Sequence, residues 1–189
     1  TGNANVALIV AGNGVTSYNN GQTQGAIAVA TGASLVTDGT ADDLGSISVL
    51  GNVSLDGTVH ANTGETISFS APSADIIINS SLVGANSITL DPGGFDIIVK
   101  STGSLQVGGE TASLTISNTD ELVFESSGGN AGVISVADTN TGDATPGNVT
   151  IQGIRSIYMQ GGTKLSATGD ILIGADDDAV AKKVQDFYM

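Results

Sequence analysis

Short stretches in which aliphatic and small polar residues alternate recur along the chain. Examples are GAIAV (25–29), GSISV (45–49), ETISF (65–69), NSITL (86–90) and GVISV (132–136). A period of two places every second side chain on one face, as in a strand with one buried side. The pattern therefore predicts many short β-strands separated by turns.

The aliphatic centres of these strands return at nearly regular intervals. A first set is spaced by 19 to 26 residues and comprises Leu8, Ile27, Ile47, Ile67, Ile88, Leu114, Ile134 and Ile157. A second set follows 8 or 9 residues later and comprises Leu35, Leu55, Ile76, Ile97, Leu122 and Leu165. A third, weaker set comprises Val59, Leu82 and Leu105. Repeats of this length are typical of solenoids. We expect an all-β fold, a parallel β-helix of about eight coils over residues 1–178, in which each strand pairs with its copy one coil away.

A β-sandwich is the alternative fold. It requires hairpin connections between neighbouring strands, and the two-residue turn sequences that favour hairpins are few. They are Asn13-Gly14, Asn20-Gly21, Asp38-Gly39 and Asp56-Gly57. The repeating strands therefore favour the solenoid.

The C-terminal segment has a different pattern from the rest of the chain. Val180, Val184 and Phe187 lie at helical spacing, and they follow the acidic run 176–178, where negative charge favours a helix start. The sequence predicts a short helix over residues 179–189. Such a helix either caps the open end of the solenoid or docks on a partner subunit.

Two repeat units, GSISVLGNVSLDGTV (45–59) and TGDILIGA (168–175), resemble the repeats of filamentous-haemagglutinin-type bacterial adhesins. The likeness is one of pattern and extends from about residue 25 to residue 175. The Asn-Pro-Asn signatures of that family's secretion domain are missing. The resemblance implies a right-handed parallel β-helix at the cell surface, and it assigns no functional residue.

Composition and charge narrow the functional classes. The chain has 27 glycines, 19 acidic residues against 5 Lys and Arg, and a formal net charge of −14. Such a surface repels phosphate backbones, so no nucleic-acid partner is expected. No apolar run reaches the length of a membrane span, and without cysteine there is no disulfide framework. This composition, rich in glycine and acidic residues and poor in basic ones, is typical of a secreted or surface protein of a microbe.

The residues available for catalysis are few. The basic residues are Lys100, Arg155, Lys164, Lys182 and Lys183, the only histidine is His60, and no G-x-S-x-G stretch is present. We therefore expect no enzyme. The alternative is a carbohydrate-binding or polysaccharide-processing β-helix, which would need aromatic platforms. The aromatic residues do not cluster along one column of the predicted repeat, and the threonines do not stack in a Thr-x-Thr column.

Calcium is the one cofactor that the sequence suggests, because Asp, Asn and carbonyl oxygens in turns suit hard cations. The candidate ligands form three clusters: Asp38, Asp42 and Asp43; Asp138, Asn140 and Asp143; Asp176, Asp177 and Asp178. None follows a known calcium-loop spacing, and solvated turn residues are the competing interpretation. Asn-x-Ser/Thr triplets for glycosylation occur at Asn52, Asn79 and Asn148.

Together these features predict a non-enzymatic extracellular structural protein. We expect a self-assembling subunit of a filament or surface matrix, or an adhesin, whose partners are copies of itself, other surface components or glycans. Strand addition at the open ends would join the copies. The predicted contact segments are residues 1–15 and 176–189, with the apolar residues Val6, Leu8, Val10, Val180, Val184 and Phe187.

Overall fold

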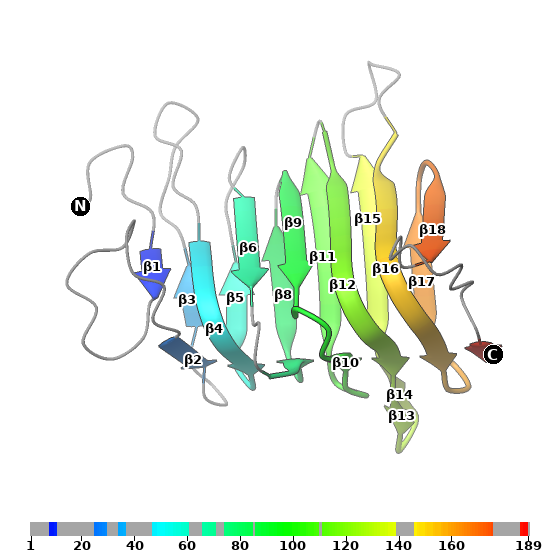
Figure 1. Ribbon diagram of the computed structural model, residues 1–189, viewed down its shortest axis with the longest axis horizontal. Helices are drawn as coiled ribbons and strands as arrows, with labels where there is room; N and C mark the ends of the chain where they lie inside the picture. The colour runs from blue at the N-terminus through cyan, green and yellow to red at the C-terminus, as the bar shows by residue number, and fades with distance from the viewer. Residues whose placement is uncertain are drawn as a thin grey trace.

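The computed structural model is an all-β solenoid (Figure 1). It describes residues 8–10, 25–29, 34–36, 47–60, 66–70, 74–84, 86–109, 111–138, 146–175 and 186–188. These residues form strands and turns, and none of them belongs to a helix that could cross a membrane. Equivalent strands of successive coils pair in parallel and in register, which confirms the solenoid prediction.

The strands lie on three faces of the coil. Face 1 is made of β1 (Leu8–Val10), the start of β4 (Ile47–Leu55), β6 (Thr66–Ser70), β9 (Ser87–Asp91), the starts of β12 (Ser113–Phe124) and β16 (Asn148–Met159), and β18 (Ile171–Ala175). Face 2 is made of β2 (Gly25–Val29), β7 (Ile76–Ile78), β10 (Ile97–Val99), the second halves of β4, β12 and β16, and β19 (Asp186–Tyr188). Because three long strands turn the corner, faces 1 and 2 form one 11-stranded sheet.

Face 3 is a separate six-stranded sheet. It contains β3 (Ser34–Val36), β5 (Thr58–His60), β8 (Ser81–Gly84), β11 (Ser104–Gly109), β15 (Val133–Asp138) and β17 (Lys164–Ala167). A small antiparallel hairpin of β13 (Ser126–Ser127) and β14 (Asn130–Ala131) interrupts the path from face 2 to face 3 and projects beyond the body of the solenoid (Figure 1).

The core is a set of aliphatic columns inside the three faces. On face 1, Ile67, Ile88, Leu114 and Val149 are stacked in register, and each is fully buried or nearly so. Face 2 adds Ile76, Ile97, Leu122 and Ile157, and face 3 adds Val59, Leu82, Leu105 and Ile134. Each column is a continuous apolar row along the solenoid axis, which fixes the register of the coils.

The described strands make six complete coils and two strands of a seventh, where the sequence predicts about eight coils. Ile27 and Ile157 lie on face 2 and Ile134 lies on face 3, although the sequence pattern placed all three with the face 1 set. Leu35 and Leu165 lie on face 3 rather than with the second set. All three faces share the same alternation of aliphatic and small residues, so the sequence spacing alone did not separate them.

The predicted C-terminal helix is wrong over residues 186–188. These residues form β19, which pairs in parallel with the second half of β16 and aligns Phe187 with Ile157. Aromatic residues suit a pleated strand. The free edge of β16 on face 2 also offers hydrogen-bond partners to backbone groups, many of which would have no intrahelical partner in so short a helix. Residues 179–185 lie outside the described part of the chain.

The corner between faces 2 and 3 yields a test of the fold. In two coils this corner is a similar tight turn, in which Gly103 N–H donates to the Lys100 carbonyl (2.8 Å) and Thr163 N–H donates to the Gln160 carbonyl (3.1 Å). A Cβ on Gly103 would lie 2.2 Å from the Ile78 carbonyl oxygen of the preceding coil, whereas a Cβ on Gly161 would meet nothing within 4 Å.

We therefore expect Gly103→Ala to destabilise the protein by about 1–3 kcal/mol, because the coils must move apart to admit the methyl group. Gly161→Ala is the matched control and should unfold like the parent chain. Urea unfolding followed by far-UV circular dichroism measures both. Equal midpoints for the two variants would contradict the close approach of the coils.

Candidate functional site

A row of acidic side chains runs along the edge where face 2 begins. The register of face 2 places Asp75, Asp96 and Glu121 on neighbouring coils, each directly before a buried aliphatic residue. Asp96 N–H donates to Asp75 Oδ1 (3.1 Å), and Glu121 N–H donates to Asp96 Oδ1 (3.0 Å). We call Asp75, Asp96, Asp120 and Glu121 the acidic row.

Stacking changes the titration of the central carboxylate. Partial burial raises the pKa of Asp96 above its usual range, and the neighbouring charges of Asp75, Glu121 and Asp120 raise it further, while the backbone hydrogen bond from Glu121 lowers it. Burial and like charges both disfavour the ionised form. Ionised Asp96 is therefore a source of repulsion in the folded chain.

Arg155 closes one end of the acidic row. Its guanidinium donates to Asp120 (Nη2 to Oδ2, 3.0 Å, and Nε to Oδ1) and also to Glu121 Oε1. Both carboxylates raise the pKa of Arg155, with the hydrogen bond to Asp120 as the largest cause. The group is solvent-exposed, so its main effect is to neutralise local negative charge at the boundary between two coils.

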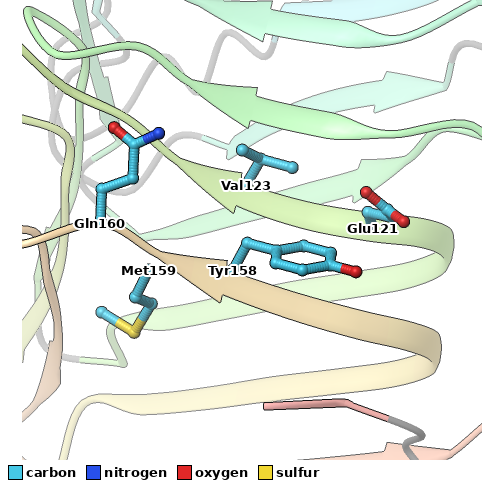
Figure 2. A pocket seen from close by; sticks show the side chains of 5 residues that line it. All are labelled: Glu121, Val123, Tyr158, Met159 and Gln160. Atoms are coloured by element: carbon cyan, nitrogen blue, oxygen red, sulfur yellow. The ribbon is translucent and has the colours of Figure 1, made fainter. Parts of the chain in front are cut away.

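An open depression of about 380 Å³ lies beside the acidic row on the outer surface of face 2 (Figure 2). It is lined by Glu121, Val123, Tyr158, Met159 and Gln160. Val123 and Tyr158 are register partners on β12 and β16. The amide oxygen of Gln160 accepts a hydrogen bond from Ser126 N–H (2.7 Å) at the base of the β13–β14 hairpin. The depression therefore combines an apolar floor, an aromatic ring, a carboxylate and an amide.

The outer columns of the sheet are more regular than the sequence suggested. Tyr158 and Tyr188 are register partners, so two aromatic residues do share a column of face 2. On face 1, Thr89, Thr115 and Thr150 are in register and form a column of hydroxyl side chains. This is a column of single threonines and not of Thr-x-Thr pairs, because the residues two positions away are not threonine. The sequence did not reveal either column, because the intervals between these residues vary with the lengths of the connecting loops.

Most of the predicted calcium ligands lie outside the described residues. These are Asp38, Asp42, Asp43, Asn140, Asp143, Asp176, Asp177 and Asp178. Asp138 ends β15, and its backbone pairs with that of Gly109. Within the described part of the chain, no group of three or more His, Cys, Asp or Glu side chains is placed to hold a metal ion.

The predicted contact residues are only partly within the described chain. Leu8 and Val10 belong to β1, where they align with Ile47 and Val49, and Phe187 belongs to β19. Val6, Val180 and Val184 lie outside the described residues.

The basic residues and the histidine are dispersed. Lys100 forms an ion pair with Glu125 (2.7 Å) and Lys164 is exposed at the start of β17, on a different face from Arg155. His60 ends β5 and is half-buried. Lys182 and Lys183 are not among the described residues.

The last described coil exposes one of its core positions. Ile171 occupies the same inner column of face 1 as Ile88, Leu114 and Val149, which are 0% exposed, yet Ile171 is 42% exposed. The next residue, Leu172, is 59% exposed. Within the described chain, β18 pairs only with β16, so its outer backbone edge has no strand partner there. Neither residue stands out in the sequence, because TGDILIGA (168–175) has the same pattern as the internal repeats.

Comparisons with protein-family models, curated proteins and solved structures find no match to this chain.

The raised pKa of Asp96 predicts a pH-dependent stability difference. Asp96→Asn keeps a side-chain oxygen that can accept the hydrogen bond from Glu121 N–H, but it removes the negative charge. The variant should therefore be more stable than the parent at pH 7. The pKa of Asp96 in the folded state lies above its unfolded-state value of 3.8, so ionised Asp96 lowers the stability of the parent at neutral pH. As the pH falls through the folded-state pKa towards 3.8, Asp96 becomes protonated and the parent regains the stability that its charge had cost. The advantage of the variant should disappear there.

Urea midpoints at several pH values measure this effect. Asp170→Asn is the control, since Asp170 is exposed and lies outside the acidic row. If Asp96→Asn were no more stable than Asp170→Asn at neutral pH, the combined cost of burial and repulsion at Asp96 would be negligible.

Proposed function

We propose that this protein is a non-enzymatic structural subunit that assembles end to end, as part of an extracellular filament or surface matrix. The observation that carries the proposal is the exposure of Ile171 at a position that is fully buried in the internal coils. A further coil stacked on β18 would cover this side chain and pair the free backbone edge of the strand. A second copy of the chain offers such a coil at its other end.

The two ends of the described solenoid suit this role. Figure 1 shows β1 at one end and β18 at the opposite end, and each pairs on one side only with the described strands. Backbone hydrogen bonds across the junction would give affinity, and the aliphatic columns would give register. Contacts between unlike ends extend into filaments when the rotation between copies does not close a ring.

The surface location rests on composition and on the resemblance to bacterial adhesin repeats. The net charge of −14 and the five basic residues describe a strongly acidic particle, which repels other such particles along its sides. Lateral association is therefore disfavoured relative to contact between the apolar ends. The same end-to-end rod could project an adhesive surface from a cell.

The assembly proposal is tested by placing a charge on the open end. Ile171→Asp should abolish filaments seen by negative-stain electron microscopy, because the junction would bury an unpaired carboxylate. Phe95→Asp is the matched control: Phe95 is 40% exposed, but it lies in the turn between β9 and β10 on the side of the rod. Deletion of residues 1–15 should abolish filaments from the other end while far-UV circular dichroism still reports β structure.

Filaments of unchanged length from Ile171→Asp and from the deletion variant would contradict end-to-end assembly. A parent protein that stays as dispersed particles, with or without millimolar calcium, would contradict it as well. Filaments that need calcium would indicate that the acidic clusters outside the described residues contribute to the junction.

A second candidate function, glycan binding, is favoured by the depression in Figure 2. Tyr158 supplies an aromatic side chain, and Glu121 and Gln160 supply polar groups that can hydrogen-bond sugar hydroxyls. The neighbouring acidic row disfavours acidic sugars, so neutral glycans are the expected ligands.

A glycan array probed with the parent and with Tyr158→Ala tests this second candidate. Binding by the parent that falls at least tenfold in Tyr158→Ala is the expected result. Phe95→Ala removes an exposed aromatic side chain away from the depression and should bind like the parent. No binding to any glycan by the parent would exclude this function.

A further inference from the structure

The outer column of face 1 changes from hydroxyl to aliphatic residues at both ends of the described solenoid. Register pairs place seven residues in this column, one from each coil: Ile9, Ser48, Ser68, Thr89, Thr115, Thr150 and Leu172. The five internal coils carry a hydroxyl residue at this position. The first and last coils carry an aliphatic residue. The aliphatic residue is therefore found only in the first and last of the described coils.

The C-terminal member of this column is a large apolar side chain in contact with water. Leu172 is 59% exposed, whereas its neighbour Thr150 is half-buried on the adjacent coil. Leu172 follows Ile171, which is 42% exposed at an inner position. β18 thus exposes an inner and an outer aliphatic side chain together. A further strand paired with its edge would remove both side chains from contact with water, which is favourable.

From these observations, and on the basis of the end-to-end assembly proposed above, we infer the register of the junction. We propose that β18 of one copy pairs in parallel with β1 of the next copy, with Ile171 opposite Leu8, Leu172 opposite Ile9, and Ile173 opposite Val10. Leu8 and Val10 occupy the register positions of the Ile67 and Phe69 columns, because β1 aligns them with Ile47 and Val49 and β4 aligns those with Ile67 and Phe69. Leu172 and Ile9 form an aliphatic pair on the outer surface of the junction.

Neighbouring registers are less favourable. A shift by one residue would place inner residues opposite outer ones along the whole strand, since side chains alternate between faces. A shift by two residues would separate Leu172 from Ile9 and leave both in water. The proposed register is the one that stacks the inner residues on inner residues and joins the two outer aliphatic residues.

The proposed junction also differs from a closed two-fold dimer through the same edge. β1 and β18 lie at opposite ends of the same chain, so each copy uses one end as donor and the other as acceptor (Figure 1). A two-fold dimer would instead pair β18 with β18 in antiparallel orientation. The two arrangements differ in which residues come together, and crosslinking can separate them.

Engineered cysteines test the register directly, because the chain has no cysteine of its own. The single variants Ile9→Cys and Leu172→Cys are mixed, allowed to assemble, oxidised and separated on a non-reducing gel. Neighbouring strands are about 4.8 Å apart, within the Cα separations that disulfides span. We expect a crosslinked dimer that forms from the mixture at least tenfold more than from either variant alone.

Thr150→Cys mixed with Ile9→Cys is the matched control. Thr150 is in the same outer column but one coil further from the junction, about 10 Å from the added strand, which is beyond disulfide reach. The Ile9→Cys, Leu172→Cys double variant should give a ladder of covalent multimers, because each copy then carries both halves of the junction.

The outcomes separate this inference from the proposed function. Filaments in the microscope without a crosslink between positions 9 and 172 would overturn the register and leave end-to-end assembly in place. A crosslink that forms equally well from Leu172→Cys alone would also overturn it, in favour of a two-fold contact. Dispersed particles from the parent protein would overturn both the register and the assembly.

Discussion

The parallel hydrogen bonding of each coil to the coils before and after it determines the rest of this structure. The strands of each face pair in register, so that Ile67, Ile88 and Leu114 follow one another along one inner column. Three such faces enclose an aliphatic core, in which 24 hydrophobic residues are buried within the described chain. Backbone groups at an internal coil have partners on both sides, whereas those at a terminal coil have partners on one side.

In-register stacking also brings like surface residues together. Serine and threonine tolerate this arrangement, since hydroxyl groups both donate and accept hydrogen bonds. Carboxylates repel one another, and the acidic row shows how the chain limits that repulsion. Backbone N–H groups of Asp96 and Glu121 donate to the carboxylate one coil away, and Arg155 neutralises the end of the row. Burial, and after it the remaining repulsion from Asp75, Glu121 and Asp120, raise the pKa of Asp96.

The strands and the solenoid could be predicted from the sequence, because a period of two and a repeat of about 20 residues are local patterns. The face of each strand could be predicted only in part. Leu8, Ile47, Ile67, Ile88 and Leu114 do share a column, and the weaker third set of strands is face 3.

Residues that meet across loops of unequal length could not be predicted. Asp75, Asp96 and Glu121 are separated by 21 and 25 residues, so no fixed period aligns them. Because the loops differ in length, the sequence spacing also does not reveal the threonine column or the pairing of Tyr158 with Tyr188. The helical spacing was misleading for Phe187, because the free edge of β16 pairs with residues 186–188 as a strand. The exposure of Ile171 depends on which strands stack against it in space, and its neighbours in the sequence do not reveal that.

The β13–β14 hairpin shows how such a rod can acquire new surface without changing its core. Its tip is Gly128-Gly129, with φ angles of 59° and 84°, and a Cβ at either glycine would meet nothing within 4 Å. Its base closes through Gly132 N–H, which donates to the Glu125 carbonyl (2.9 Å), so the strands before and after it pair as if the hairpin were absent. A peptide grafted into this tip would be carried clear of the solenoid, and in a linear polymer it would be displayed once per subunit at a constant spacing.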